Sequence, residues 1–239
     1  MIAGGIDGCK YGWIMATHKA GEYGITIHKS FAALMESNSN LGRVLIDIPV
    51  GLSTANYPRT IEKAMRSELG QRSSTVFNAP CRLAVYEKDN EKARLLNQQV
   101  ENKSLSIQSL QIRNKIREVD EFLSRGKTSV EIIESHPELC FKYLNGGVVL
   151  SKKSRPEGIA QRLEILSKYE DGVMEIYDRA VKQYKRKEAK RDDIIDAICL
   201  CLVNKLGEGN RLKYLADENS ISENGIKIKI GYYKGENHW

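Results

Sequence analysis

The sequence lacks the features of membrane and secreted proteins. Its 239 residues contain no apolar run near the roughly 20 residues that cross a bilayer, and the longest such run lies near DAICLCLV at 196–203. The start has no basic region followed by a hydrophobic stretch and a small-residue cleavage site, which argues against secretion. We therefore expect a cytoplasmic protein with no membrane partner.

Cysteine is scarce and its spacing is not that of a metal site. The five cysteines show neither Cys-x-x-Cys spacing nor the nearby second histidine that zinc sites use. Cys199 and Cys201 fall in an apolar segment, where a free thiol behaves as a small hydrophobic side chain. We expect reduced thiols without a metal role.

Low-complexity tracts and repeats are also missing, while the 41% hydrophobic and 28% charged residues are ordinary for a soluble globular protein. The net charge of +6 is concentrated in KQYKRKEAKR at 182–191, which holds six basic residues and one acid. Such a run is usually a solvated helix face. It would also suit a polyanion, because lysine and arginine near phosphates release counterions on binding.

Hydrophobic periodicity predicts alternating strands and helices. Three strands are expected in succession as an antiparallel meander, over residues 2–6, 11–19 and 23–30. SFAALMES at 30–37 has a serine N-cap and helical spacing. The β-rich run at 42–52 should end as a strand at about Asp47, because Pro49 cannot donate to a sheet.

The second half of the chain reads as mostly helical. Residues 58–126 show helical patterns, KTSVEIIESHPE at 127–138 is a further strand, and helices continue to about 206. GIKIKIGYY at 225–233 alternates with period two, which predicts a short strand on a sheet edge.

These elements predict one α/β domain over residues 1–239. Its sheet would be mixed and five-stranded, with the antiparallel meander followed by parallel strands, and helices would flank it. A helical insertion is expected at about 55–127, since no linker marks a domain boundary.

Several acids occupy positions where they could converge. Asp7, Asp47 and Glu134 each follow a β-rich run and precede a glycine or proline within three residues, and ligands of α/β sheets gather at strand ends. Asp193 and Asp196, three positions apart, share one face of a helix that packs on the sheet.

Crowded carboxylates raise one another's pKa unless cations keep them ionised. Hard oxygen ligands select Mg²⁺ or Mn²⁺, and two such ions about 3.5–4 Å apart support in-line phosphoryl displacement. For any one of these acids a turn or helix cap is the simpler interpretation. Their joint pattern favours a two-metal site. The predicted ligands and catalytic acids are Asp7, Asp47, Glu134, Asp193 and Asp196.

Five ordered segments carry a family resemblance. GIDGCKYGWI, LIDIPVGL, RSSTVFNAP, IIESHPELCF and DDIIDA resemble the bacterial and archaeal family of domain of unknown function 429, described as predicted RNase H-like nucleases, from residue 2 to about 205. The resemblance implies an RNase H-like fold with Asp7 as the central metal bridge and Asp47 as a fourth-strand ligand. It makes Asp193 and Asp196 the acids of a resolvase-type helix, and Glu134 a further ligand or a base that orients water.

Two positions depart from the family pattern. Tyr11 stands where a second glycine is expected after GCK, which could narrow the approach to Asp7. Glu62 stands where an aspartate is usual, a change with little expected effect.

A loop rich in hydrogen-bond donors, GQRSSTVFNAPCR at 70–82, could hold phosphate oxygens. It could equally be a structural loop, stabilised by salt bridges of the arginines within it and of Arg59 nearby. His136 could carry a proton near the metals, or could cap the next helix through Pro137. The predicted substrate-binding residues are Lys10, Arg66, Arg72, Ser73, Ser74, Arg82, Lys152 and Lys153.

Three functions stay open at this point. The first is a metal-dependent nuclease that hydrolyses DNA or RNA. The second uses the same fold to bind ATP or transfer a phosphoryl group, but it requires two glycine-rich phosphate loops and only GIDGCKYG at 5–12 fits. The third is an inactive module whose basic segment binds RNA or a protein. The sequence does not decide between monomer and homodimer.

Overall fold

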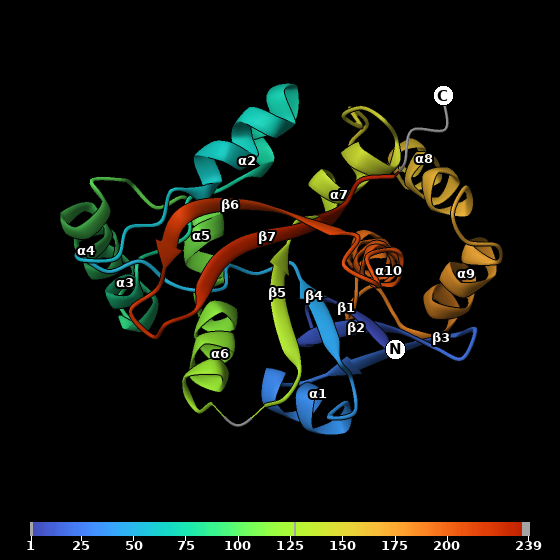
Figure 1. The fold of residues 1–239 in the computed structure, drawn as a ribbon, viewed down its shortest axis with the longest axis horizontal. Coiled ribbons are helices and arrows are strands. Elements are labelled where there is room, and N and C mark those ends of the chain that lie inside the picture. Colours follow the sequence, from blue (N-terminus) through green and yellow to red (C-terminus); the bar gives the residue numbers. More distant parts are fainter. Residues whose placement is uncertain (1, 127, 236–239) are drawn as a thin grey trace.

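The computed structural model describes residues 2–126 and 128–235, and for residues 217–220 it describes the backbone alone. Within this part of the chain a mixed sheet of seven strands runs in the order β3-β2-β1-β4-β5-β7-β6. Helices lie on both sides of the sheet (Figure 1). The mixed α/β architecture predicted from the sequence is therefore confirmed.

The five predicted strands of the sheet are present. They are β1 (Ala3–Gly8), β2 (Trp13–Lys19), β3 (Glu22–His28), β4 (Arg43–Ile46) and β5 (Glu131–Ser135). The first three form the antiparallel meander, and β4 and β5 follow as parallel strands. Residue 127, where the predicted fifth strand would begin, lies outside the described residues.

The prediction of a five-stranded sheet was wrong, because a C-terminal hairpin extends it. β7 (Lys227–Tyr233) pairs in parallel with β5, and β6 (Leu212–Ile221) pairs antiparallel with β7. The strand expected at 225–233 is therefore interior, and β6 forms the edge. The sequence LKYLADENSI of β6 has a polar second half without the alternation that marks a strand, so pairing with β7 defines it.

Strand β2 shows how the sheet divides its apolar side chains. Ile14 and Ala16 face the core that contains α10 (Arg191–Leu206). Trp13 and Met15 face the opposite core, which α1 (Phe31–Ser37) and α6 (Arg113–Ser124) cover. The alternation follows from the period of two in a strand. Both faces of the central strands are consequently buried.

Helix α10 packs directly on β1 at a glycine. A Cβ on Gly5 would lie 2.1 Å from the backbone nitrogen of Cys201 and 2.4 Å from the carbonyl oxygen of Ala197. Only glycine allows this close approach of two backbones. The contact fixes the start of α10 beside the end of β1.

The remaining helices on the α10 side are α7 (Pro137–Leu144), α8 (Pro156–Ser167) and α9 (Val173–Gln183). They contribute to the same core as α10. The basic run at 182–191 is not a helix face, since α9 ends at Gln183 and α10 begins at Arg191. A turn closed by the Glu188 N–H and the Lys185 carbonyl at 2.8 Å interrupts it.

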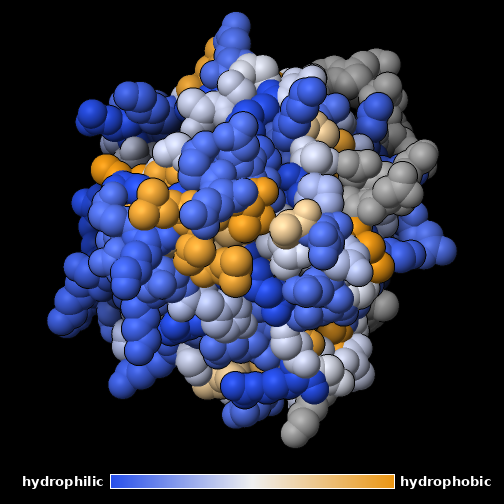
Figure 2. Space-filling view, turned by 90° about the vertical axis from the view of Figure 1, so that its left-hand side faces the viewer, coloured by the Kyte–Doolittle hydropathy of each residue, from blue (hydrophilic) through white to orange (hydrophobic). Residues whose placement is uncertain are grey.

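Short helices fill the predicted insertion. They are α2 (Ile61–Leu69), the 3-10 helix η1 (Gly70–Thr75), α3 (Arg82–Tyr86), α4 (Asn90–Glu101) and α5 (Ile107–Gln111), followed by α6. Figure 2 views the molecule from the side of α4 and shows apolar side chains within a hydrophilic surface. Leu83, Leu95 and Ile107 are the most exposed large apolar residues of these helices.

The five cysteines are free and buried. Across the described residues, no helix combines the length and the apolar character that a membrane crossing requires.

Candidate metal centre

Three carboxylates meet at the carboxyl end of the central strands. Asp7 belongs to β1, Asp47 directly follows β4, and Asp196 lies in the second turn of α10. One ligand oxygen of each lies within 4.8 Å of the others. The parallel strands β1 and β4 end in register, which brings the first two acids together, and the contact of α10 with Gly5 adds the third.

The three acids are not fully satisfied by the protein. Oδ1 of Asp7 accepts the Gly8 N–H at 2.6 Å, and Oδ2 of Asp196 accepts the Lys153 ammonium at 2.5 Å. Oδ1 of Asp196 has no partner among the described residues, although the side chain is 0% exposed. A buried acceptor without a partner costs about 1–3 kcal/mol. The cluster therefore has acceptor capacity that nothing in the described chain uses.

Burial raises the pKa values of all three acids, and the charges of neighbouring carboxylates add to this effect. Burial, with the charges of Asp47 and Asp196, raises the pKa of Asp7 well above its ordinary value. Burial raises the pKa of Asp47 to about 7 against the opposing charge of Lys153. The pKa of Asp196 is raised by burial in the same way, also against Lys153. Without a further cation, the cluster holds protons near neutral pH.

Lys153 is the cation that the chain itself supplies. Burial lowers its pKa, but the charges of Asp196, Asp7 and Asp47 together raise that pKa well above its ordinary value. Its side chain remains 37% exposed, so it lies at the rim of the centre. The segment that carries Lys153 packs closely against α8 at Gly158. A Cβ at Gly158 would lie 2.0 Å from the carbonyl oxygen of Lys152, so this close approach requires glycine.

Asp193 lies outside the group of three. Its Oδ2 accepts the Lys190 N–H at 2.8 Å at the start of α10, as a capping carboxylate does. Burial raises its pKa to about 6, and its charge contributes to the raised pKa of Asp7. It is thus an electrostatic neighbour of the centre, and its role as a ligand stays a prediction.

Glu134 also lies outside the group, although its place at a strand end matches that of Asp47. Its Oε1 accepts Nη2 of Arg59 at 2.6 Å, and its Oε2 accepts the Val50 N–H at 2.8 Å. Arg59 is 2% exposed and also pairs with Glu62 at 2.5 Å. This buried network ties the segment after β4 to β5. Both carboxylate oxygens of Glu134 accept hydrogen bonds in this network. Arg59 is engaged by Glu134 and Glu62 and is buried, so its guanidinium is not available to bind a substrate.

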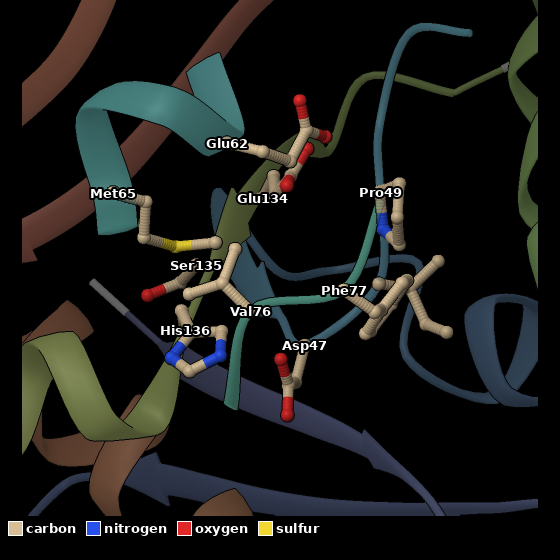
Figure 3. Close-up of a pocket in the computed structure, with 10 residues that line it drawn as sticks. Asp47, Pro49, Glu62, Met65, Val76, Phe77, Glu134, Ser135 and His136 are labelled. Atoms are coloured by element: carbon tan, nitrogen blue, oxygen red, sulfur yellow. The ribbon is translucent and has the colours of Figure 1, made fainter. Parts of the chain in front are cut away.

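A pocket adjoins the centre on the side of α2 (Figure 3). Asp47 and His136 lie at one end of it, and Glu134 and Glu62 lie at the other. Burial, with the charge of Lys153, lowers the pKa of His136 to about 4, so the ring is neutral at pH 7. Nδ1 of His136 is buried and has no partner among the described residues.

The predicted phosphate-binding arginines mostly have structural partners. Arg66 donates to the carbonyl of Val76 and, at 2.6 Å, to Asn78. Arg82 pairs with Asp120 at 2.7 Å. These contacts favour the structural interpretation of the loop at both positions.

Arg72 is half-buried and lies 3.5 Å from Glu138. Ser73 and Ser74 belong to η1, and Lys10 and Lys152 are exposed. Of the predicted substrate-binding residues, Lys153 alone is hydrogen-bonded to an acid of the group of three, within the described part of the chain.

Sequence reasoning missed Lys115 of α6. Its ammonium donates to the Gly12 carbonyl and lies 4.8 Å from the centroid of the Trp13 ring, and its stem packs against Gly8. This places a positive charge beside the strand end that carries Asp7. Because Lys115 is one of several basic residues on an amphipathic helix, nothing in the sequence distinguishes it.

Comparison with known proteins identifies one relationship. A family model described as a protein of unknown function (DUF429) matches residues 5–219, a range that contains all three acids of the group. No curated protein and no solved structure matches the chain.

Proposed function

The chain belongs to the DUF429 family of proteins of unknown function, and we propose that it is a metal-dependent phosphodiesterase that hydrolyses nucleic acid. The observation that carries the proposal is the group formed by Asp7, Asp47 and Asp196, whose ligand oxygens lie within 4.8 Å of one another. An acid on the first strand, an acid after the fourth and an acid on a late helix follow the order that an RNase H-like fold would require. We assign the chain to that fold on this basis.

The residues present fit divalent ions. All three donors are carboxylate oxygens, which prefer hard cations such as Mg²⁺ and Mn²⁺. Oδ1 of Asp196 is buried without a partner among the described residues, and the raised pKa values of Asp7 and Asp47 support a place for more positive charge than Lys153 supplies. Two oxygens on opposite sides of a Mg²⁺ ion lie about 4.2 Å apart, which fits within the 4.8 Å that bounds the distances between the three ligand oxygens. The group would hold one or two such ions.

The side chains around the group have distinct tasks in this proposal. Bound divalent ions would supply the Lewis acidity that activates water and stabilises charge on a phosphodiester. The partly exposed ammonium of Lys153 contacts a substrate phosphate through a charge-assisted hydrogen bond. The neutral ring of His136 offers Nδ1 as an acceptor that orients a water molecule beside Asp47.

Cleavage assays test the proposal directly. The full chain is incubated with single-stranded, hybrid and branched DNA and RNA in Mg²⁺ or Mn²⁺. We expect metal-dependent cleavage that falls at least about 100-fold in Asp7→Asn, since changes that only support metal ligands already cost 10- to 100-fold. Asp178→Asn, an exposed acid of α9, is the matched control and should keep full activity. Absence of hydrolysis on every substrate with both metals, or full activity in Asp7→Asn, would refute the proposal.

Metal binding is measured separately from hydrolysis. Thermal unfolding is followed at increasing Mn²⁺ concentration. When the free Mn²⁺ concentration is 100 times the dissociation constant, binding should stabilise the wild-type protein by about 2.7 kcal/mol. Asp178→Asn should respond equally and Asp7→Asn should not respond. If the protein binds Mn²⁺ in this way but cleaves nothing, the proposed metal centre stands and the proposed nuclease activity is refuted.

A further inference from the structure

The basic run at 182–191 carries charge that is not neutralised by any ion pair among the described residues. All six of its basic side chains are exposed, and none forms an ion pair with an acid in the described part of the chain. Its one acid, Glu188, accepts the backbone N–H of Lys185 at 2.9 Å. The six are Lys182, Lys185, Arg186, Lys187, Lys190 and Arg191.

The loop within this run is attached to the metal centre on two sides. The carbonyl of Glu188 accepts the Tyr11 N–H at 2.9 Å, which fastens the loop to the turn that follows Asp7. Two residues further on, the N–H of Lys190 donates to Asp193 of α10, one helical turn before Asp196. The unneutralised charges therefore flank the segments that carry two of the three acids.

The turn between β1 and β2 holds Tyr11 in a fixed place. The backbone groups of Cys9 and Gly12 bond to each other at 2.9 and 3.3 Å. Gly12 has a φ of +154°, and a Cβ there would lie 2.3 Å from the carbonyl oxygen of His28. The ammonium of Lys115 donates to the Gly12 carbonyl. A turn secured by these contacts presents Tyr11 outward.

Tyr11 is 41% exposed, and the ammonium of Lys29 lies 6.0 Å from the centroid of its ring. Lys10 and Lys29 are exposed beside it. This exposed aromatic ring lies among cations, four residues after Asp7, and does not pack in the hydrophobic core. It is the combination by which proteins hold single-stranded nucleic acid, where bases stack on aromatic rings and phosphates contact lysine and arginine.

We infer that a single nucleic-acid strand binds across Tyr11 and the basic run at 182–191 and so passes the metal centre, with one base stacked on the Tyr11 ring. This inference rests on the proposed function and adds the substrate class, a single strand. A duplex keeps its bases stacked inside the helix and offers no free base face to Tyr11. Single strands therefore bind more tightly than duplexes of the same length.

The test measures binding without cleavage. Asp7→Asn serves as the parent protein, and fluorescence anisotropy follows labelled single-stranded and duplex oligonucleotides of mixed sequence in EDTA. Adding Tyr11→Ala should weaken single-strand binding roughly 5- to 150-fold, the range for loss of one base–aromatic stack. Tyr11→Phe keeps the ring and should bind as the parent does, and thermal melts of both variants verify that they are folded.

The contribution of the basic run is measured through salt. Replacing three of its cations by glutamine should reduce the slope of log affinity against log salt by about 2, because each phosphate contact on a single strand contributes about 0.7. A matched control replaces three exposed basic residues at the opposite sheet edge and should leave the slope unchanged. The test variant carries Lys185→Gln, Arg186→Gln and Lys187→Gln, and the control carries Arg211→Gln, Lys213→Gln and Lys227→Gln.

Three results would overturn the inference: parental affinity in the Tyr11→Ala variant, equal affinity for duplex and single strand, or an equal slope change in the control. Binding of anionic phosphatidylserine vesicles that depends on the same cations, without single-strand binding, would assign the surface to a membrane instead. If wild-type protein cleaves nucleic acid while Tyr11→Ala binds normally, this inference fails and the proposed function stands. If single-strand binding follows Tyr11 but nothing is cleaved, the proposed function alone fails.

Discussion

The ammonium of Lys153 donates to Oδ2 of Asp196 at 2.5 Å, so the proposed metal centre already contains one cation of the chain. Because the three acids repel one another, this cation stabilises the protein when no divalent ion is bound. The same ammonium occupies an acceptor that a metal ion would use. If the group binds metal as proposed, Lys153 would both support the metal-free group and compete with the metal ion for Asp196.

Replacing Lys153 by methionine separates these two effects. In EDTA the variant should lose roughly 1–2 kcal/mol of stability, less than the 3–5 kcal/mol of a fully buried pair because part of the side chain is exposed. The stabilisation by saturating Mn²⁺ should be larger than in the wild type. Thermal unfolding with and without Mn²⁺ measures both, and Lys152→Met, which alters an exposed neighbour, is the control. An unchanged response to Mn²⁺ would show that Lys153 does not compete with metal.

Asp47 makes the metal-free protein sensitive to pH. Burial raises its pKa from 3.8 to about 7 in the folded protein, so between these values the folded state binds more protons than the unfolded chain. The stability that protonation of Asp47 contributes is therefore fully present below pH 3.8 and is lost as the pH rises through about 7. Asparagine cannot titrate and avoids this loss.

The expected result is that Asp47→Asn is more stable than the wild type at pH 8 in EDTA, by on the order of 4 kcal/mol, and gains little at pH 4. Urea unfolding at both pH values measures the difference. Asp178→Asn should show no such dependence. If the Asp47→Asn variant differed from the wild type equally at both pH values, the titration of Asp47 would not be the cause.

The acids at the strand ends could be predicted because the end of a strand is marked in the sequence. An apolar run followed by an acid and then glycine or proline locates the ends of β1 and β4, and parallel pairing of these strands brings Asp7 and Asp47 together. The choice between Asp193 and Asp196 could not be predicted, since both lie on one helix face. It depends on how α10 is rotated against Gly5, a contact between residues about 190 positions apart.

Glu134 shows a second limit of sequence patterns. It has the same local context as Asp47, but Arg59 lies 75 positions away in the sequence and neutralises it. Nothing near either residue indicates this pairing. The edge strand β6 was missed for a related reason, because its pairing with β7, recorded at residues 212–216 and at Ile221, is not indicated by an alternating apolar pattern in its own sequence.

Glu134→Gln tests whether this residue is a structural partner of Arg59 or a metal ligand. The variant should cost about 1–3 kcal/mol, because a buried charged hydrogen bond is weakened while Glu62 still pairs with Arg59. Stabilisation by Mn²⁺ should remain, in contrast to Asp7→Asn. Chemical unfolding and the Mn²⁺ titration together give the answer. Loss of the Mn²⁺ response with unchanged stability would instead make Glu134 a ligand.

The alignment of the acids depends on the contact between Gly5 and α10. In Gly5→Ala the new methyl group meets backbone atoms at 2.1 and 2.4 Å, which cannot rotate away, so α10 must shift and the cost should be about 3 kcal/mol or more. The shift moves Asp196 away from Asp7, and stabilisation by Mn²⁺ should weaken as well.

Gly4→Ala, on the adjacent position of the same strand, is the matched control. Its methyl group meets the flexible end of Met15 at 2.6 Å and a methyl of Val44 at 3.0 Å, so side-chain adjustment on the other face of the sheet can absorb it at smaller cost. Both variants remove one glycine from β1 and should change the unfolded chain equally. A larger loss of stability and of Mn²⁺ response in Gly5→Ala than in Gly4→Ala therefore isolates the packing of α10. Equal losses would mean that the position of Asp196 does not depend on this contact.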